Sequence, residues 1–505
     1  MRIRLITATP EFENDLGDVL RLFYGDVDFV TDAPEKTFTH TAREENGVWI
    51  DDWSCENHCR RTETPICAGH PIEIKRARKR CVKDGLYRLL KEMTGMNLPW
   101  GALTGIRPTR LLYEGLDAGL NREQARERLC ETFDVSADRA ELLSQIADMQ
   151  TGILHPEKDE FDLYIGIPFC ATRCSYCSFA SGEIGNGKLV EPYIAALEHE
   201  IAECGKMMRE KGLKLRAGYI GGGTPTAIPV SALARVLDAA QSAFPGAKEW
   251  TVEAGRPDTI DREKLQMMLD RRVDRISVNP QTFSDETLAR VGRAHTGADT
   301  VRAYELAREM GFQDINMDLI AALPGETPEI FARSIEKVIE LNPDSVTVHA
   351  LAIKRSSKLH EQMHVQNGAH GQVSAAGAQE MIDLARERLT GAGWKPYYLY
   401  RQKYMAGNLE NVGYAKPGKA CLYNIGNMEE TASVLALGAG AISKWLFNQD
   451  ERAVLSGYDP ELLRFSNIQL RIERAANVRN IEQYVSRVDE MIARKREMIF
   501  PEARA

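Results

Sequence analysis

A strand-and-helix unit repeats about six times between residues 162 and 350, and this repeat limits the chain to one broad fold class. Short apolar runs alternate with longer stretches of helical periodicity, a pattern typical of strands joined by covering helices. The apolar runs are 163–168, 217–222, 249–254, 274–279, 314–320 and 344–350. The helical stretches between them are 190–206, 230–243, 260–270, 297–310 and 327–340. We therefore predict an α/β fold with a parallel sheet, open or closed, whose reactive groups lie at the carboxyl ends of the strands.

The segments on either side of the repeat are less regular. At ~150 residues per domain, the length of the chain suggests roughly three domains. After about residue 375 the pattern becomes mostly helical, with good helices at 375–390 and 481–498. The stretch 397–440, rich in Gly, Asn and Tyr, is too long for an ordinary connection and is typical of a lid beside a barrel mouth. We predict an α+β extension over 1–157, a barrel over 158–375 and a mostly helical C-terminal domain over 376–505 that covers the barrel mouth.

Composition excludes several classes of protein. The chain is 43% hydrophobic and 27% charged, which indicates an ordered globular protein and not a disordered one. A net charge of -9 gives no general reason to bind nucleic acid. No apolar run reaches the ~18 residues of a membrane span, and the first residues do not resemble a secretion signal. We expect a cytoplasmic protein, a monomer by preference, in which most of the ten cysteines are thiols or metal ligands.

Three cysteines follow the first apolar run with the spacing CxxxCxxC: Cys170, Cys174 and Cys177. Iron–sulfur clusters usually take four cysteine ligands, so three would leave one iron open. An open position is typical of a catalytic metal site, whereas structural sites are closed. A zinc site or three ordinary thiols are the alternatives, but zinc sites favour two CxxC pairs, and no second pair lies nearby. The spacing therefore favours an iron–sulfur cluster.

A glycine-rich motif, GGGTPT at 221–226, follows the second apolar run. Consecutive glycines allow the backbone to approach a ligand closely. With the cysteine loop and its place after the first strand, this motif resembles the radical S-adenosylmethionine (SAM) enzymes, and more narrowly the oxygen-independent coproporphyrinogen III oxidase group. The resemblance covers about residues 160–445 and implies a partial (β/α)6 radical SAM barrel.

The resemblance also implies the cofactors. The three cysteines would hold a [4Fe-4S] cluster, and the amino and carboxylate groups of SAM would chelate the fourth iron. In that family the reduced cluster cleaves SAM to a 5′-deoxyadenosyl radical, which abstracts a hydrogen atom from the substrate. A reductant such as flavodoxin or ferredoxin would supply the electron.

Further residues at the ends of the later runs match the SAM-binding positions of the group. By resemblance, Tyr164, Gly222 and Glu253 would serve a first SAM molecule, although a surface salt bridge is the plain alternative for Glu253. A second SAM or other ligand would be surrounded by Tyr176, Gly223, Thr224, Gln281, Arg293 and Asp318. The chain would thus bind one or two SAM molecules.

Two positions depart from the group's pattern. Phe179 stands where the best-known coproporphyrinogen oxidases carry a fourth cysteine, and the related haem chaperones have an aromatic residue there. Those chaperones also carry a His-Asn pair after a cysteine, whereas this chain reads Cys421-Leu-Tyr423-Asn424. Tyrosine is a rarer iron ligand than imidazole, which argues against haem handover. The stretch 98–110 and the long N-terminal extension resemble the HemZ-type coproporphyrinogen dehydrogenases.

This resemblance implies the oxidative decarboxylation of two propionates of coproporphyrinogen III to vinyl groups. The product would be protoporphyrinogen IX, in anaerobic haem biosynthesis, and the tetrapyrrole would be the substrate. Two alternatives stay open. One is a haem-binding chaperone of the same family, and the other is radical SAM methylation or ring opening of a tetrapyrrole.

Other candidate residues have no secure role. Cys55, Cys59 and Cys67 lie near His58 and His70 and could form a zinc or second-cluster site, but their spacing matches no firm template. His349, Lys354 and Arg355 are candidates for contacting the substrate. The basic run 75–83 has the spacing of a solvated helix face, or it could dock an acidic partner such as flavodoxin.

Overall fold

The structure is a computed structural model that describes residues 1–67, 71–105, 107–354, 357–359, 361, 373–402, 408–447 and 471–500. The chain divides into two compact units, of which the smaller contains Met1–Ser144. The larger contains Gln145–Phe447 and the residues from Arg471 onward. Among the described residues, no helix is long and apolar enough to cross a membrane.

The smaller unit contains a five-stranded mixed sheet in the order β2-β1-β3-β4-β5. Its strands are β1 (Arg2–Thr7), β2 (Asp28–Phe29), β3 (Lys36–Glu45), β4 (Val48–Cys55) and β5 (His58–Pro65). Its helices are η1 (Pro10–Phe12), α1 (Glu13–Tyr24), α2 (Pro71–Thr94), α3 (Thr109–Asp117), α4 (Arg122–Phe133) and most of α5 (Ala137–Met149). Apolar residues of β1, α1, β3, β4 and α2 form one buried cluster, including Ile3, Leu16, Phe38, Trp53 and Leu86. This unit therefore has a core of its own.

The larger unit is built on one eleven-stranded sheet in the order β14-β15-β13-β12-β11-β10-β9-β6-β16-β17-β18. Six consecutive strands pair in parallel: β6 (Glu160–Ile167), β9 (Lys214–Gly222), β10 (Glu249–Gly255), β11 (Arg275–Val278), β12 (Ile315–Ala321) and β13 (Ser345–Ala350). Each corresponds to one of the six apolar runs, so the predicted α/β fold is confirmed. All four residues of β11 are buried, as expected for a strand that is covered on both faces.

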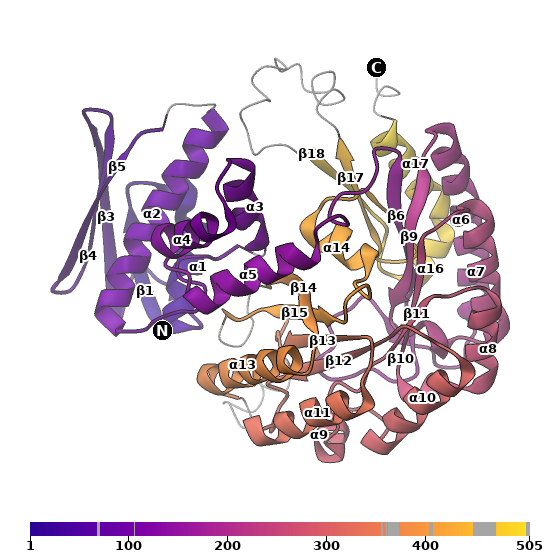
Figure 1. Cartoon of the computed structure of the whole chain (residues 1–505). Coiled ribbons are helices and arrows are strands. Elements are labelled where there is room, and N and C mark those ends of the chain that lie inside the picture. Colours follow the sequence, from indigo (N-terminus) through magenta and orange to yellow (C-terminus); the bar gives the residue numbers. More distant parts are fainter. Residues whose placement is uncertain are drawn as a thin grey trace. The chain divides into compact units, whose positions relative to one another are not determined.

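Helices follow the parallel strands and lie along the outer side of the sheet (Figure 1). They are α6 (Val190–Glu210), α7 (Val230–Ala243), α8 (Arg262–Asp270), α9 (Asp285–Arg290), α10 (Gly297–Met310), α11 (Pro328–Leu341) and α13 (Ala375–Gly391). The caps explain several of their boundaries. Thr296 forms a capping box with Asp299 at the start of α10, and Thr327 caps α11 just before Pro328. The turns η2 (Pro225–Ala227) and η3 (Pro257–Thr259) follow β9 and β10.

The C-terminal part differs from the mostly helical domain that we predicted for 376–505. Beyond β13, the sheet continues with the antiparallel strands β15 (Asn411–Ala415) and β14 (Lys395–Tyr400). On its other side β16 (Val434–Leu437) lies parallel to β6, followed by antiparallel β17 (Ile442–Phe447) and β18 (Arg471–Ala476). Beyond α13, the helices of this part that the structure describes are α14 (Leu422–Glu429), α16 (Ile481–Ser486) and α17 (Val488–Ile499).

The described residues of the stretch 397–440 are therefore largely strand and helix, and the compact units do not divide at residue 375. The reason lies in the pairing partners. These strands are short and add to a sheet whose other strands come from distant sequence, so their local pattern carries little signal. The proposed cover over the barrel mouth stays a prediction.

Candidate active site

The cysteine loop begins at the carboxyl end of β6 and is closed by a short pair of strands. β7 (Phe169–Cys170) pairs with β8 (Gly182–Glu183), and the Ile184 N–H donates to the Cys170 carbonyl at 2.8 Å. Within the loop the Cys177 N–H donates to the Cys174 carbonyl at 3.2 Å. Cys174 is buried, while Cys170 and Cys177 are half-buried. The backbone thus brings three thiols to one end of the barrel.

The environment of these thiols fits a cluster better than a single metal ion. Burial raises the pKa of Cys177, and the neighbouring thiols of Cys174 and Cys170 raise it further. Three thiolates this close therefore need compensating positive charge, which an iron–sulfur cluster supplies. Among the described residues, no three His, Cys, Asp or Glu side chains converge on one ion. A cluster binds each cysteine at a separate iron, so its ligands need not converge on one point.

Two glycines allow the end of β9 to pass close to the cysteine loop. Gly222 has φ of +113°, and a Cβ there would lie 3.0 Å from the Ile167 backbone. A Cβ at Gly223 would lie 2.6 Å from the Phe169 carbonyl oxygen and 3.0 Å from Cys170 Sγ. Any larger residue at either position would push the loop away from the strand ends.

Arg293 lies against the buried side of the loop. Its Nη1 is 3.9 Å from Cys174 Sγ and 3.3 Å from Tyr176 Oη, and its Nη2 donates to the Asn279 carbonyl at 2.7 Å. Burial disfavours the guanidinium charge, but Tyr176 and Cys174 outweigh burial and raise the pKa of Arg293. Among the described residues no carboxylate pairs with it. A buried cation of this kind is suited to an anionic ligand, such as a thiolate or a carboxylate.

Glu253 lies near the carboxyl end of β10, beside a tyrosine that sequence reasoning did not single out. Tyr219 Oη donates to Glu253 Oε1 at 2.5 Å. Burial raises the pKa of Glu253 to about 7, although the Tyr219 hydrogen bond opposes the shift. The negative charge of Asp318 adds to the rise. Glu253 can therefore act either as hydrogen-bond donor or as acceptor near neutral pH.

Gln281 has a strained backbone that fixes it against β12. Its φ is +66°, its N–H donates to the Asp318 carbonyl at 2.9 Å, and its carbonyl accepts from the Ile320 N–H at 2.9 Å. Gln281 Oε1 is buried without a partner, as are Ser277 Oγ and Asn279 Oδ1. Strained residues and unpartnered buried polar atoms cluster at ligand sites, so this edge of the sheet is suited to a polar ligand.

Tyr164 lies deeper in the barrel than the loop. Its ring stacks with Tyr219 at 6.3 Å between centroids and with Tyr423 at 6.2 Å, and Tyr219 and Tyr423 are 4.5 Å apart. Burial raises the pKa of all three phenols. Tyr423, which stands where the chaperones carry histidine, is therefore packed inside the barrel.

The start of α14 lies at the amino ends of the strands, opposite the cysteine loop. Cys421 Sγ donates to Glu249 Oε1 at 3.2 Å, and Glu249 is the first residue of β10. Arg216 Nη2 donates to the Leu422 carbonyl at 3.0 Å. Cys421, which sequence analysis placed in a lid, is thus a buried part of the barrel floor.

Of the other candidates, only His349 lies beside these residues among those that the structure describes. His349 faces Asp318, with 3.9 Å between Nε2 and Oδ2, and is 3.4 Å from Tyr400 Oη. Lys354 is exposed, and Arg355 lies outside the described residues. Cys55 is buried in β4, whereas Cys59 and Cys67 are exposed; His70 is not described. A zinc or second-cluster site at these cysteines stays a prediction.

Three residues of the basic run on α2 form ion pairs within the smaller unit. Arg78 makes two bonds of 2.6 Å to Asp51, and Lys79 pairs with Asp15 at 3.4 Å. Arg80 pairs with Glu114 at 3.3 Å. Docking of an acidic partner on this run stays a prediction.

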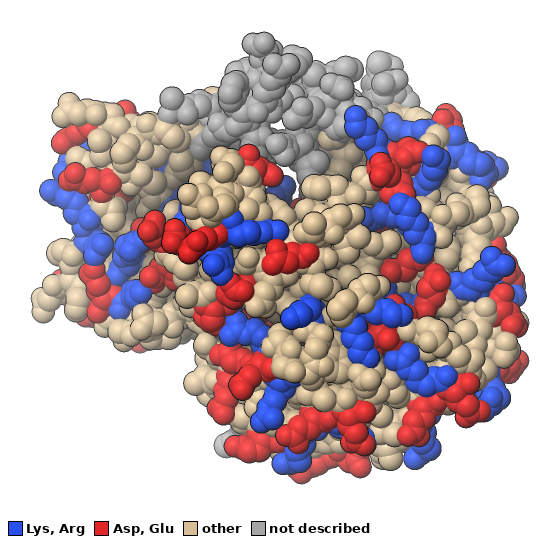
Figure 2. Space-filling model, viewed as in Figure 1, with Lys and Arg blue, Asp and Glu red and all other residues tan. Residues whose placement is uncertain are grey.

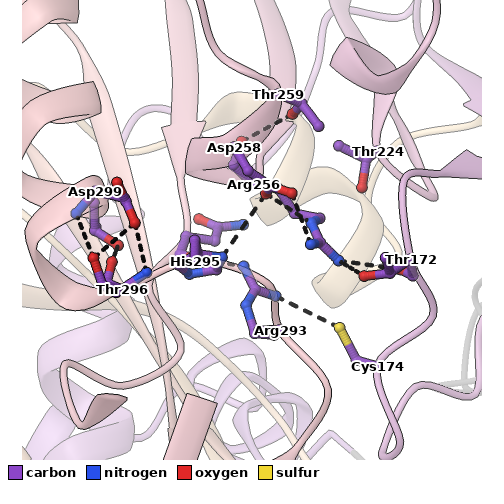
Figure 3. Close-up of polar contacts among 12 residues, drawn as sticks. Thr172, Cys174, Thr224, Arg256, Asp258, Thr259, Arg293, His295, Thr296 and Asp299 are labelled. Carbon is purple, nitrogen blue, oxygen red and sulfur yellow. Dashed lines mark hydrogen bonds and ion pairs between the residues drawn. The ribbon is translucent and has the colours of Figure 1, made fainter. Parts of the chain in front are cut away.

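Two residues that sequence reasoning missed, Arg256 and Asp258, lie beside the loop (Figure 3). Arg256 Nη1 donates to the Thr172 carbonyl at 3.1 Å and to Thr172 Oγ1 at 2.7 Å. Asp258 accepts from Arg256 Nε and Nη2 at 2.9 and 2.8 Å. In the sequence these residues stand only as an arginine before a proline after the third strand, a pattern that does not indicate a functional site.

Three features define a radical SAM protein: six consecutive parallel strands in one sheet, three cysteines on the loop after the first of them, and a glycine-rich end to the second. The sequence profile of the radical SAM superfamily matches residues 164–338. The chain is 40% identical over 368 residues to the oxygen-independent coproporphyrinogen-III oxidase-like protein HemZ of Bacillus subtilis, covering 71% of this chain and 72% of that protein. The chain therefore belongs to the radical SAM superfamily and, within it, to the HemZ family, and a [4Fe-4S] cluster and SAM are the cofactors that this membership implies.

The other relatives fall into two groups, haem chaperones and coproporphyrinogen oxidases. The haem chaperone HemW of Escherichia coli is 29% identical over 291 residues, which is 56% of this chain and 70% of that protein. The oxygen-independent coproporphyrinogen III oxidase of Cereibacter sphaeroides is 28% identical over 301 residues, which is 57% of this chain and 64% of that protein. The solved structure of coproporphyrinogen III oxidase (HemN) from Escherichia coli superposes with a TM-score of 0.51 at 23% identity, over 68% of this chain and 73% of that one. This likeness shows a shared fold.

Proposed function

We propose that the chain is a radical SAM oxidoreductase that converts propionate side chains of coproporphyrinogen III to vinyl groups. The observation that supports this most is the set of unpartnered polar groups beside the three thiols. The Arg293 guanidinium has no carboxylate partner among the described residues, and Gln281 and Asn279 carry unpartnered buried oxygens. Such a site suits an anionic, polar cofactor next to the cysteine loop.

Each residue of the site has a role in this proposal. Bound cluster and SAM together supply one-electron chemistry that ends in abstraction of a hydrogen atom from the substrate. Cys170, Cys174 and Cys177 would hold the cluster. A first SAM would lie at Tyr164, Gly222 and Glu253. A second SAM or the substrate would be surrounded by Tyr176, Gly223, Thr224, Gln281, Arg293 and Asp318.

Anaerobic product analysis tests the proposal. The reconstituted protein is incubated with coproporphyrinogen III, SAM and dithionite, and products are identified by mass. We expect a tricarboxylic intermediate and then protoporphyrinogen IX, which reflect two successive losses of carbon dioxide. SAM cleavage without either product would contradict the proposed substrate. The Cys174→Ala variant is the control, and we expect it to lose SAM cleavage because only two cluster ligands remain.

A haem chaperone is the second candidate, favoured by the HemW relatives and by Phe179, whose side chain is exposed next to the loop. It predicts stoichiometric haem binding and transfer without turnover. The packing of Tyr423 against Tyr219 argues against it, because the position that holds histidine in the chaperones is buried in a stack. A methylated or linear product would instead support methylation or ring opening of the tetrapyrrole.

We also propose that a flavodoxin or ferredoxin supplies the electron. Replacing dithionite with reduced flavodoxin should sustain turnover. If turnover with dithionite is normal but no flavodoxin or ferredoxin supports it, this partner is wrong.

A further inference from the structure

Thr172 lies in the middle of the CxxxC segment, and it is held from outside the loop. Arg256, which follows β10, donates through the same Nη1 to both the carbonyl and the hydroxyl of Thr172, at 3.1 and 2.7 Å. Figure 3 shows this guanidinium directed at Thr172 and the guanidinium of Arg293 directed at Cys174, two residues further along the loop. Arg256 therefore binds the backbone of the loop at Thr172, between Cys170 and Cys174.

The Arg256 side chain is itself fixed. It is 3% exposed, and its remaining nitrogens bind both oxygens of Asp258. A bidentate pair of this kind sets the direction of the guanidinium as well as its charge. His295 lies 3.8 Å from Asp258, and burial lowers the pKa of this histidine to about 4, so a neutral imidazole and not a second cation faces the pair near neutral pH.

The backbone of Arg256 is tied to the glycine-rich motif. Thr259 Oγ1 donates to the Arg256 carbonyl at 2.8 Å and is 2.7 Å from Thr226 Oγ1. Thr226 Oγ1 donates in turn to the Ala254 carbonyl at 2.7 Å. The ends of β9 and β10 and the cysteine loop are thus joined by one chain of hydrogen bonds that runs through Arg256.

We propose that Arg256 is a positioning residue that holds the cysteine loop in its cluster-binding shape through Thr172. The inference rests on the proposed role of the three cysteines as cluster ligands. Arg256 touches none of the thiols; it acts on the backbone that carries them. Outer contacts that orient metal ligands commonly change metal retention by about 10-fold to 100-fold when they are removed.

The test measures how fast a chelator removes iron from the reconstituted, anaerobic protein. We expect Arg256→Gln to release iron at least about 10-fold faster than the wild type. Thr172→Val removes only the hydroxyl contact and buries no charge, so we expect a smaller change in the same direction. The double variant should be no faster than Arg256→Gln alone, because both changes break the same contact. Arg256→Lys should restore part of the retention.

Arg271→Gln is the matched control. Arg271 also binds an aspartate, Asp238, through Nε and Nη2, at 2.8 and 2.9 Å, but on the outer helices and away from the loop. We expect it to release iron at the wild-type rate. The electron paramagnetic resonance spectrum of the reduced cluster, with and without SAM, should change in the Arg256 and Thr172 variants and not in this control.

Two outcomes would overturn different claims. If Arg256→Gln and Thr172→Val both retain iron and the wild-type spectrum, the positioning role is wrong. If Arg256→Gln does not fold, Arg256→Lys and Thr172→Val decide together, and wild-type rates in both overturn the inference. A wild-type protein that takes up no cluster would instead contradict the proposed function.

Discussion

Glu326 lies in the turn after β12 and supports the segment that carries Gln281. It accepts a hydrogen bond from the Thr282 hydroxyl, and both side chains are buried. Burial raises the pKa of Glu326 to about 7, against the opposing hydrogen bonds of Thr282 and Thr287. Because it lies away from the thiols, this carboxyl can be studied in the protein without cofactors.

The raised pKa makes the stability of the larger unit depend on pH. Below pH 4.5 the carboxyl is mostly protonated in both the folded and the unfolded chain, so its contribution to the stability of the folded chain is fully present. As the pH rises to 7, the unfolded chain ionises first, so stability is lost, and the loss levels off above pH 7 at about 3 kcal/mol. The glutamine does not ionise, so we expect the free energy of unfolding of Glu326→Gln, relative to that of the wild type, to increase from pH 5 to pH 8. Urea unfolding at both pH values measures this difference. The same difference at both pH values would contradict this.

Single residues differ in how far their roles can be predicted from sequence. The three cysteines, Glu253 and Arg293 stand in motifs or at strand ends, and the structure places them near the barrel mouth. Arg256 and Glu326 carry no local signal, since their importance depends on burial and on contacts with residues far along the chain. Tyr423 could be recognised as a departure, but its stack with Tyr219 could not.

At the scale of elements, α17 and α6 are joined by a buried ion pair. Lys495 Nζ donates to Glu200 Oε1 at 2.7 Å, and both side chains are fully buried. Glu200 Oε2 also accepts from the Gly438 N–H at 2.8 Å, in the turn after β16. Asn477 and Tyr484 complete the hydrogen bonding of the carboxylate, at 2.9 and 2.6 Å. Through Glu200, helix α17 therefore helps to fix the turn after β16, the strand that lies beside β6.

Removing one partner of this pair should be costly. We expect Lys495→Met to lower the free energy of unfolding by about 3–5 kcal/mol, because Glu200 is left buried without its counter-charge. Arg496→Met is the control on the same helix: Arg496 pairs with Glu210 at 2.9 Å, but both are about half exposed, so we expect a loss of about 0–1 kcal/mol. Chemical unfolding measures both, and equal losses would contradict the assignment.

The elements that sequence predicted best are those with repeated periodicity. The six parallel strands from β6 to β13 and the longer helices that follow them correspond to predicted stretches, because each alternation repeats the same amphipathic pattern. The six-residue helix α9 was not predicted. The strands β14 to β18 were missed because they lie outside the repeated strand-and-helix alternation, whereas β11 and β13, which are as short, lie within it. β16 pairs with β6, and most of the barrel lies between these two strands in the sequence. No local sequence pattern indicates so distant a partner.

At the scale of the whole molecule, the two compact units differ in what they contribute. The cysteine loop, the glycine-rich motif and every described residue of the candidate site belong to the larger unit. The smaller unit has its own buried core, and its role is unassigned. On the face shown in Figure 2, Lys and Arg are interspersed with Asp and Glu, so the described residues form no extended basic surface there.

This division predicts the behaviour of a shortened chain. We expect residues 145–505 to fold, bind the cluster and cleave SAM at the wild-type rate, because all eleven strands of the large sheet and the start of the larger unit lie within them. The measurements are iron content and 5′-deoxyadenosine formation, with the full chain as control. Loss of the cluster would show that the smaller unit is needed for the larger one to fold. Normal SAM cleavage with loss of tetrapyrrole product would assign the smaller unit to substrate binding.

The position of β16 beside β6 also orders events in time. A ribosome completes the cysteines and β9, the first neighbour of β6, long before it reaches residues 434–437, so β6 waits for its second neighbour, β16, until most of the barrel has been synthesised. Pairing between such distant segments is a slow step in folding. The turn after β16 forms later still. In it, the Ala439 N–H donates to the Tyr193 hydroxyl, which in turn donates to the Gly166 carbonyl near the end of β6. We therefore expect the loop to acquire its final shape, and its cluster, only after the barrel has been translated.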